Sequence, residues 1–308
     1  MLASARSAGG VEPCPSCGSA AQHDRGAISS ASIFAGLVLE EALAGGRLLE
    51  CRECALSWRA PILEQRFYDE LYGKAKGDEW QSDAPRRDHQ KVADALRDQL
   101  SGGDVLDIGC GNGALLGMLP PAFKRFGVEI GREARAAARG RGVELVAASF
   151  EELNGLHQTF DAVIACDVIE HSANPRAFVA NAAKRLRPGG LLILSTGNAD
   201  AWLWRLCGGR FWYCQFAEHL TFISPRWLAK QADVGAVLIG VKRFAYNPIT
   251  LGARIKTSLL LAFYMALPSA YNRLAARRRG WKSSKPYFSN PPGHGLTQDH
   301  LVAVLRRV

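Results

Sequence analysis

The sequence has no long apolar run. None of its hydrophobic stretches reaches the roughly 18–20 residues that a membrane-spanning helix needs. It also begins without the apolar stretch of about 7–15 residues that a secretory signal carries, so we expect a cytoplasmic protein. Hydrophobic residues still make up 48% of the 308 residues, and charged residues make up 22%. This composition excludes a disordered chain, a collagen-like repeat and a disulfide-stapled miniprotein, and it allows one large core plus a small module.

The eight cysteines indicate metal ligands and buried thiols rather than disulfides, because no secretory signal is present. Cys14 and Cys17 form one C-x-x-C pair, Cys51 and Cys54 form a second, and 33 residues separate the pairs. Four thiolates complete a tetrahedron, which predicts a structural zinc ion in a ribbon-like module. Two unrelated surface pairs or redox dithiols are the alternatives. The isolated cysteines are expected to be ordinary buried thiols: Cys110, Cys166, Cys207 and Cys214.

The net charge of +9 is concentrated near the C-terminus. Residues 242–308 hold twelve Lys or Arg and one acid, Asp299. The first 241 residues therefore have a net charge of −2. Such a local basic field attracts a polyanion or an anionic membrane surface. A solvated, solubilising helical face is the alternative.

A strand, a glycine turn and a helix follow one another in the middle of the chain. Residues 104–108 form an apolar strand, Gly109 to Gly113 form the turn, and residues 114–119 begin a helix. This is the first unit of a doubly wound sheet that binds an adenosine-containing ligand, and Glu129, 22 residues after Asp107, is placed to accept from a ribose. Asp107 stands just before the turn, where its charge would repel a dinucleotide diphosphate and attract a sulfonium with an ammonium group. The turn therefore favours S-adenosylmethionine over NAD.

The remaining pattern predicts a seven-stranded, Rossmann-like α/β sheet. A second strand is expected to end at residues 127–130, and further strands are expected at residues 144–148, 160–166, 191–195, 236–241 and 300–306. We divide the chain into a disordered tail (1–12), a zinc-ribbon module (13–60), a linker with N-terminal helices (61–100), a cofactor-binding core (101–245), a basic helical insertion or lid (246–298) and the last strand of the core (299–308).

The motifs VLDIGCGNG, FDAVIACDVIEH and LRPGGLLILST resemble class I S-adenosylmethionine-dependent methyltransferases. The segment from Phe216 to Ser224 resembles an element of the subgroup that acts on small molecules, lipids, quinones and sugars, several members of which carry a four-cysteine ribbon. The resemblance covers residues 100–245 well and says little about the acceptor.

The resemblance also implies roles for particular residues. Asp107 and the glycine turn would hold the methionine end, Glu129 the ribose and Ile130 the adenine, while Asp167 would lie near the methyl group. The full cofactor set is Asp107, Gly109, Cys110, Gly111, Gly113, Glu129, Ile130, Ser149, Phe150, Asp167 and Val168. Ser149 and Phe150 stand where the family often has an Asp that accepts from the adenine amine.

His171 and His219 are the candidate general bases for a hydroxyl acceptor, because both follow motif elements that open at the carboxyl edge of the sheet. A structural histidine that bonds a loop carbonyl is the alternative for each. Some quinone O-methyltransferases with a similar segment are thought to bind a divalent ion, which Asp167, Glu170 and His171 would hold here; helix capping is the favoured alternative. Residues 200–216 are rich in aromatic side chains and are expected to build the acceptor pocket or pack in the core.

Within residues 251–285, two helices are predicted at residues 251–267 and 271–279, divided at Pro268, and an apolar run is flanked by basic residues. This segment is either a contact with an anionic membrane or a lid on the body, and the first reading would place the protein peripherally at the inner membrane face. The sequence thus predicts methyl transfer to a hydroxyl of a lipid-linked, quinone-like or sugar-containing small molecule. An RNA or protein methyltransferase and a non-catalytic S-adenosylmethionine-binding protein are the rivals, and nucleic acid is the less favoured partner because no N-P-P-[YF]-type motif follows the fourth strand of the core.

Overall fold

The computed structural model describes residues 12–75, 86–279, 291–293 and 295–308. Residues 1–11 of the predicted tail, the linker residues 76–85 and residues 280–290 and 294 of the predicted insertion lie outside them. The strands of the large sheet are β6 (Gly103–Ile108), β7 (Phe123–Val128), β8 (Glu144–Ala147), β9 (Phe160–Cys166), β10 (Leu186–Gly197), β12 (Ala236–Phe244) and β13 (His300–Arg307).

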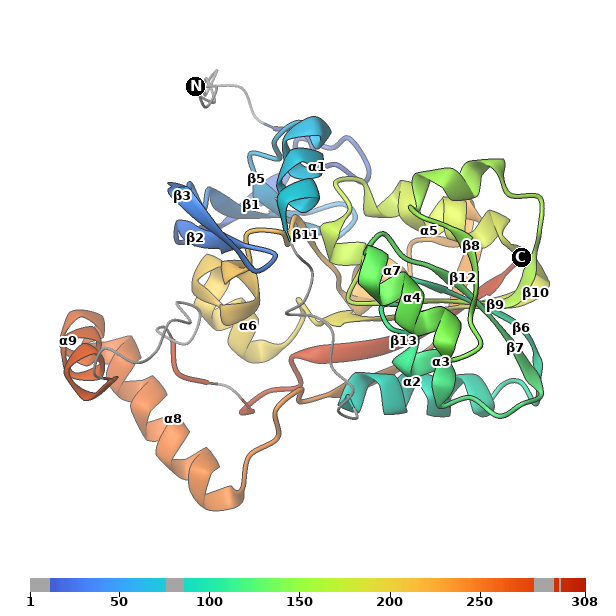
Figure 1. Cartoon of the computed structure of the whole chain (residues 1–308). Coiled ribbons are helices and arrows are strands. Elements are labelled where there is room, and N and C mark those ends of the chain that lie inside the picture. Colours follow the sequence, from blue (N-terminus) through green and yellow to red (C-terminus); the bar gives the residue numbers. More distant parts are fainter. Residues whose placement is uncertain (1–11, 76–85, 280–290, 294) are drawn as a thin grey trace.

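The large sheet has seven strands in the order β12-β13-β10-β9-β6-β7-β8 (Figure 1). Strands β6 to β10 run parallel to one another, whereas β13 runs antiparallel to both β10 and β12. The predicted doubly wound, Rossmann-like sheet is confirmed. Because β6 lies between β7 and β9, the strand order reverses beside β6, and the carboxyl ends of these strands border the crevice where ligands of such sheets bind.

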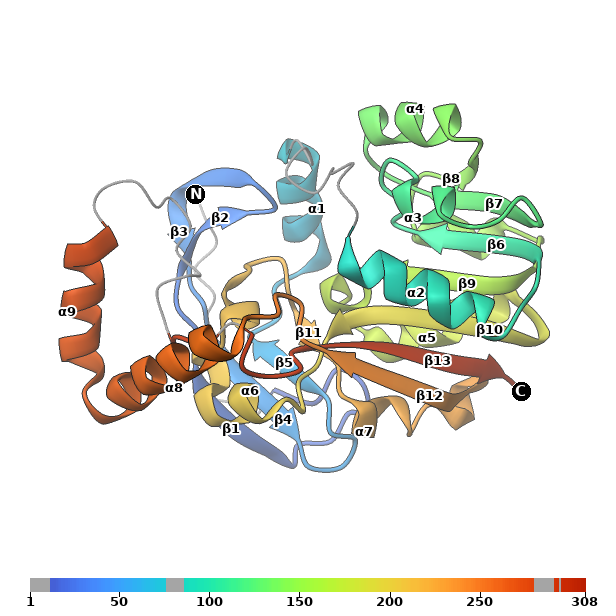
Figure 2. The same cartoon turned by 90° about the horizontal axis from the view of Figure 1, so that it is seen from below.

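Helices cover both faces of this sheet (Figure 2). One face packs against α2 (Arg87–Arg97), α3 (Ala114–Gly117) and α4 (Arg132–Gly140), and the other against α5 (Pro175–Lys184) and α7 (Pro225–Leu228). Successive residues of a strand point to opposite faces, so Val163 and Ile164 of β9 enter different cores, and both are fully buried. This explains why the strands read as continuous apolar runs.

The N-terminal module forms a second sheet with the order β1-β4-β5-β11. Its strands are β1 (Gln22–Ala27), β4 (Arg47–Cys51), β5 (Ser57–Ala60) and β11 (Thr221–Phe222), beside a hairpin of β2 (Ala31–Phe34) and β3 (Leu37–Leu43) and followed by α1 (Gln65–Lys74). Strand β11 comes from the far side of the cofactor-binding core, which the sequence did not predict. Trp58 of β5 and Trp227 of α7 are fully buried in one cluster, so the module shares a core with the large sheet.

The other helices lie between β10 and β13. They are α6 (Trp202–Cys207), α8 (Leu251–Ala266) and α9 (Pro268–Arg279), with the short 3-10 turns η4 (Gly208–Arg210), η5 (Trp212–Gln215) and η6 (Ala232–Val234). Two further 3-10 turns precede β10: η2 (Glu151–Gly155) and η3 (Ile169–His171). The predicted division at Pro268 is confirmed, since a proline suits the first position of a helix but not its interior. None of the helices in the described part is long and apolar enough to cross a membrane.

Candidate active site

The turn after β6 brings bare backbone to the carboxyl edge of the sheet. Gly109, Gly111 and Gly113 all have positive φ, at 73°, 54° and 79°. A Cβ on Gly109 would lie 2.8 Å from Cγ2 of Val168, whereas a Cβ on Gly111 would meet no atom within 4 Å. The first glycine is therefore required by packing, and the second faces open space that a ligand can enter.

Glu129 braces this turn from the end of β7. Its Oε2 accepts a hydrogen bond from the Gly111 N–H at 2.9 Å, and its Oε1 accepts one from the Gly131 N–H at 2.7 Å. Carboxylate oxygens each have a further lone pair, so both remain able to accept from a ribose. The neighbouring Ile130 side chain is 71% exposed, which leaves an apolar surface beside the carboxylate.

Asp107 is a buried acid without a full set of partners. Asp107 is only 2% exposed, and its Oδ1 has no hydrogen-bond partner in the structure. Burial, with a smaller contribution from the Glu129 charge, raises the pKa of Asp107 to about 8. A cationic group in the crevice would complete this site, which fits the ammonium and sulfonium of S-adenosylmethionine.

We expect Asp107→Asn to raise the melting temperature near pH 8 while it abolishes cofactor binding. The pKa of Asp107 is raised in the folded protein, so the carboxyl favours folding at low pH and its contribution is lost as pH rises from about 4 towards 8. The gain in melting temperature should therefore shrink as pH falls towards 4. Calorimetry in buffers of different ionisation enthalpy should also show proton release when S-adenosylmethionine binds to the wild type at pH 7, and binding without proton release would contradict this account.

The other predicted cofactor residues lie around the same edge. Cys110 is 6% exposed with its sulfur 3.8 Å from the Gly111 carbonyl oxygen, and Ser149 accepts a hydrogen bond from the Glu152 N–H at 3.4 Å. The Phe150 ring stacks on Phe178 of α5 at 4.4 Å.

Asp167 begins the loop after β9 with a φ of 52° and forms an ion pair with Arg86, which also pairs with Asp88. Burial raises the pKa of Asp167 to about 6, against the opposing charge of Arg86. Sequence reasoning missed Arg86, because the residue lies 81 positions before its partner. An arginine at this edge could also pair with the carboxylate of a methionine group.

Glu170 is sealed within the same loop, at 0% exposure. Tyr213 donates its hydroxyl to Oε1, and Thr196 donates its hydroxyl to Oε2 at 2.9 Å. Burial raises the pKa of Glu170, although the Tyr213 hydrogen bond opposes the shift. Both carboxylate oxygens are thus engaged by protein hydroxyls.

The two predicted bases come together above this carboxylate. The rings of His171 and His219 have centroids 5.1 Å apart. His219 donates from Nδ1 to the Tyr213 carbonyl oxygen at 3.0 Å, and Nδ1 of His171 lies 3.1 Å from the Glu218 carbonyl oxygen and 2.9 Å from the Tyr72 hydroxyl. Burial lowers the pKa of both histidines, well below the ordinary value for His219. His219 is therefore neutral, with the lone pair on Nε2.

A third histidine, His300 at the start of β13, was not anticipated. Its Nδ1 lies 3.2 Å from Oδ1 of Asp299, and its ring centroid is 4.5 Å from that of Tyr246. The sequence analysis predicted only a final strand at residues 300–306, without a role for this histidine. The pairing of β13 with the carboxyl end of β10, where His300 lies opposite Gly197, carries the ring to the site.

The predicted divalent-ion ligands are not gathered as expected. The ligand atoms of Glu170 and His171 lie within 4.8 Å of one another and of His219, while Asp167 is held by Arg86. Because Glu170 already accepts two hydroxyl hydrogen bonds, we derive no step through an ion at this place.

The aromatic segment 200–216 mostly packs in the core. Trp204, Phe211 and Tyr213 are 2%, 1% and 3% exposed, and the first two rings are stacked at 4.8 Å. Arg205 pairs with Asp200 rather than standing ready for a ligand. Tyr213 reaches the site through Glu170, and the Phe216 ring stacks on His219 with the ring centroids 4.8 Å apart.

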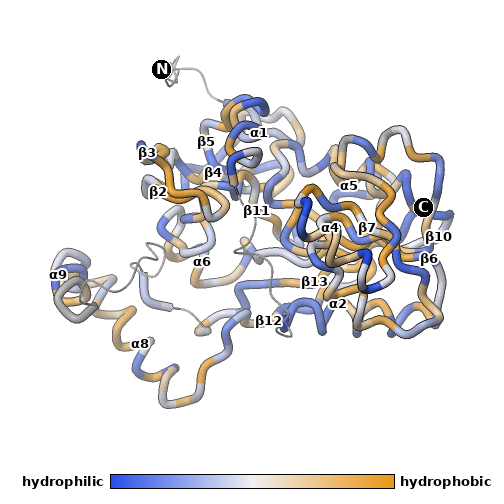
Figure 3. The backbone as a smooth tube through the Cα atoms, viewed as in Figure 1, coloured by the Kyte–Doolittle hydropathy of each residue, from blue (hydrophilic) through white to orange (hydrophobic). Residues whose placement is uncertain are grey.

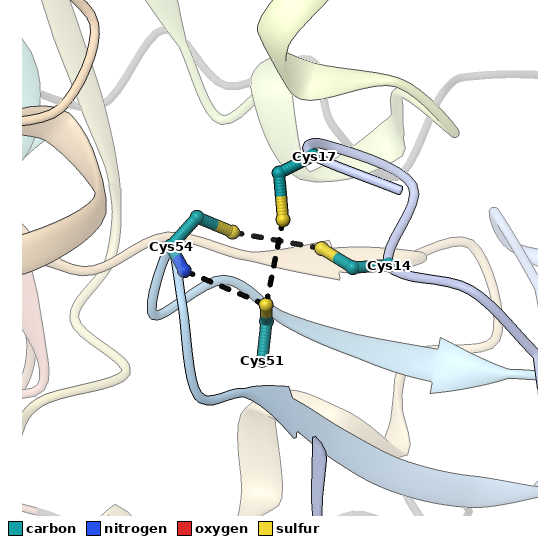
Figure 4. Close-up of side chains that lie close together, drawn as sticks. All are labelled: Cys14, Cys17, Cys51 and Cys54. Atoms are coloured by element: carbon teal, nitrogen blue, oxygen red, sulfur yellow. Dashed lines mark hydrogen bonds between the residues drawn. The ribbon is translucent and has the colours of Figure 1, made fainter. Parts of the chain in front are cut away.

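The four N-terminal cysteines converge on one point, as Figure 4 shows. The Cys14 and Cys54 sulfurs are 3.5 Å apart, as are those of Cys17 and Cys51, and all four lie within 4.8 Å of one another. Ligands about 2.3 Å from a tetrahedral zinc ion are roughly 3.8 Å apart, whereas a disulfide needs about 2.05 Å. The arrangement fits a closed zinc site, with all four positions filled by protein.

Arg59 of β5 links this module to the active site. Its guanidinium is buried and donates to the carbonyl oxygens of Cys214 at 2.7 Å, Phe216 at 2.8 Å and His219 at 3.1 Å. The backbone continues the link, because the Arg59 N–H donates to the Leu220 carbonyl oxygen at 2.8 Å. The segment that carries His219 is therefore held by the ribbon.

The family of the chain can now be stated. The family described as "Methyltransferase domain" matches residues 78–233, which span β6 to β10 and the His219 segment. The chain belongs to this family, and it is a class I S-adenosylmethionine-dependent methyltransferase.

The matches to individual proteins are more specific than the match to the family. The chain is 29% identical over 185 residues to the ubiquinone biosynthesis O-methyltransferase of Thiobacillus denitrificans, covering 55% of this chain and 80% of the relative. It is 31% identical over 166 residues to that of Aromatoleum aromaticum, covering 49% and 71%. The solved 1,6-didemethyltoxoflavin-N1-methyltransferase of Burkholderia thailandensis, with bound S-adenosylhomocysteine, has the same fold at a TM-score of 0.50 and 16% identity, covering 83% of this chain and 97% of that one.

Proposed function

We propose that this enzyme methylates a hydroxyl oxygen of a quinone-like, lipid-linked aromatic acceptor. The observation that carries the proposal is the likeness to ubiquinone biosynthesis O-methyltransferases at 29–35% identity. The site supports it, because a neutral histidine pair and a buried carboxylate suit the removal of a phenolic proton. A sugar hydroxyl, the other acceptor that the sequence suggested, is an outcome that the test below separates.

The residues divide into two groups in this proposal. S-adenosylmethionine supplies an electrophilic methyl group. The residues that would hold it are Asp107, Gly109, Cys110, Gly111, Gly113, Glu129, Ile130, Ser149, Phe150, Asp167 and Val168. His219 and His171 would orient the acceptor hydroxyl and take its proton, and the aromatic packing around Tyr213 would keep water out.

We also propose that Cys14, Cys17, Cys51 and Cys54 hold a structural zinc ion. The convergence of four sulfurs, with none contributed by the cofactor-binding core, supports a site that stabilises the ribbon rather than one that reacts.

The test is methyl transfer into a bacterial extract. The purified enzyme is incubated with S-adenosylmethionine carrying a labelled methyl group, and lipid, polar glycan, protein and RNA fractions are separated. We expect label in the lipid fraction, none with Glu129→Ala, and wild-type labelling with Glu133→Ala. The second variant makes the same change at an exposed position in the first turn of α4 and is the matched control.

Each other outcome overturns part of the proposal. Label in polar glycan would replace the lipid-linked acceptor with a sugar. Label in RNA or protein would overturn the small-molecule class and turn the basic C-terminal segment into a docking surface for a macromolecule. Absence of label from every fraction, with the cofactor still bound, would overturn the proposed acceptor class altogether.

A further inference from the structure

Helix α8 exposes an apolar face to solvent. Only Leu261 and Tyr264 of its 16 residues are buried. Figures 1 and 2 both show α8 and α9 projecting from the end of the molecule opposite the C-terminus. A surface helix normally turns its polar face outward, so this helix needs another explanation.

The outward face of α8 is a continuous apolar stripe. At 3.6 residues per turn, Leu251, Ile255 and Leu259 lie one above another, and their exposed fractions are 74%, 57% and 68%. Exposed Ala262 and Ala266 extend the stripe. Figure 3 shows hydrophobic colour along this projecting helix.

Basic side chains border the stripe. Arg254 and Lys256 fall on opposite flanks of it, since they lie about 100° before and about 100° after its centre line on a helical wheel with about 100° per residue. Both are exposed, and so is Arg273 on α9. Residues 246–298 contain no Asp or Glu. An apolar stripe with cations on both flanks matches a helix that lies in the surface of an anionic bilayer.

The inner face of α8 contacts the segment that shapes the active site. Arg210 donates to the Tyr264 hydroxyl at 3.3 Å, and Leu261 is buried in the same cluster as Trp204 and Tyr213. Tyr213 in turn donates to Glu170. A membrane under the outer face would thus lie one helix away from the acceptor segment.

We propose that Leu251, Ile255 and Leu259, with Arg254 and Lys256, form a docking face for an anionic phospholipid surface. The helix lies in the headgroup region, because it is too short and too polar at its flanks to cross the bilayer. A second copy of the chain is disfavoured, since two acid-free basic faces repel each other. Nucleic acid would use the cations but not the apolar stripe. The inference rests on the proposed function only in that a lipid-linked acceptor would enter from this surface.

The experiment is flotation of the full-length protein with phosphatidylglycerol-containing vesicles and with pure phosphatidylcholine vesicles. We expect flotation with the anionic vesicles, and a partition coefficient lowered about tenfold or more in Ile255→Glu/Leu259→Glu and in Arg254→Gln/Lys256→Gln. The matched controls are Ile239→Glu/Val308→Glu, which change exposed apolar residues elsewhere, and Lys124→Gln/Lys184→Gln, which change exposed cations of the core. Both controls should float like the wild type.

Methylation of a water-soluble catechol separates this inference from the proposed function. Variants of the docking face should keep that activity, because they lie outside the site. Equal flotation of all variants, or dimers that the Glu pair dissociates, would overturn the docking proposal and leave the enzyme's function standing. Binding to an RNA oligomer that is lost only in the Gln pair would also overturn it. Docking without methylation of any catechol would instead count against the proposed acceptor.

Discussion

A Cys51→Ala variant is expected to lose its zinc and to unfold roughly 10–20 °C below the wild type. Removing one ligand of a structural site forfeits several kcal/mol of metal-coupled folding, and about 1 kcal/mol shifts the melting temperature of a domain of this size by a few degrees. Elemental analysis should find one zinc per wild-type chain. Thermal melts with and without a chelator give the stability.

The rate of methylation should also fall in the Cys51→Ala variant when the proposed zinc ion is lost. The zinc module contributes Arg59, which holds three carbonyl groups of the segment that carries His219, and β5, which pairs with β11 two residues after His219. Cys207→Ala is the matched control, since Cys207 is a buried cysteine outside the cluster, and this variant should keep its zinc. A wild type without zinc, or a Cys51→Ala variant that melts with the wild type, would exclude the proposed site.

His219→Asn is expected to lower kcat about 10²–10³-fold while leaving the affinity for S-adenosylmethionine unchanged. The Asn amide can keep the hydrogen bond that Nδ1 of His219 donates to the Tyr213 carbonyl, but it has no base at the position of Nε2. Because burial lowers the pKa of His219 well below 6.5, the wild-type kcat at saturating S-adenosylmethionine should stay level as pH falls to that value and decline only below it.

The pH profile separates catalysis from structure. In His219→Asn the decline at low pH should disappear along with most of the rate. A variant that keeps the wild-type kcat would make His219 a structural residue that bonds a loop carbonyl. The same comparison with His171→Asn tells which ring takes the proton, since both side chains lie beside Glu170.

Local patterns in the sequence were enough for the features that neighbouring residues create. The glycine turn, Glu129 and the two C-x-x-C pairs form motifs of known spacing, so they could be singled out before the fold was known, whereas the hydrogen bonds from Gly111 and Gly131 to Glu129 came from the structure. The same holds for the break at Pro268 and for the apolar strands of the large sheet, whose order agrees with the predicted fold. The cysteine cluster could be predicted although its pairs are far apart, because two C-x-x-C pairs are a spacing typical of a shared metal site, and the four sulfurs do lie together.

The rest of the site depends on contacts between distant residues. Arg86 meets Asp167 across 81 positions and Arg59 meets His219 across 160, and neither pairing leaves a periodic trace in the sequence. His300 reached the site only because β13 enters the sheet beside β10.

The sequence by itself determined that this chain builds a doubly wound sheet, binds an adenosine-containing cation and gathers four thiols. Each of these follows from backbone freedom, hydrophobic period or ligand chemistry within short segments. Only the tertiary structure decided that β11 joins the ribbon to the acceptor segment and that Glu170 is sealed by two hydroxyls. It also decided which side of α8 faces outward, because a helix with apolar residues on two sides can pack through either side until the body of the protein covers one of them.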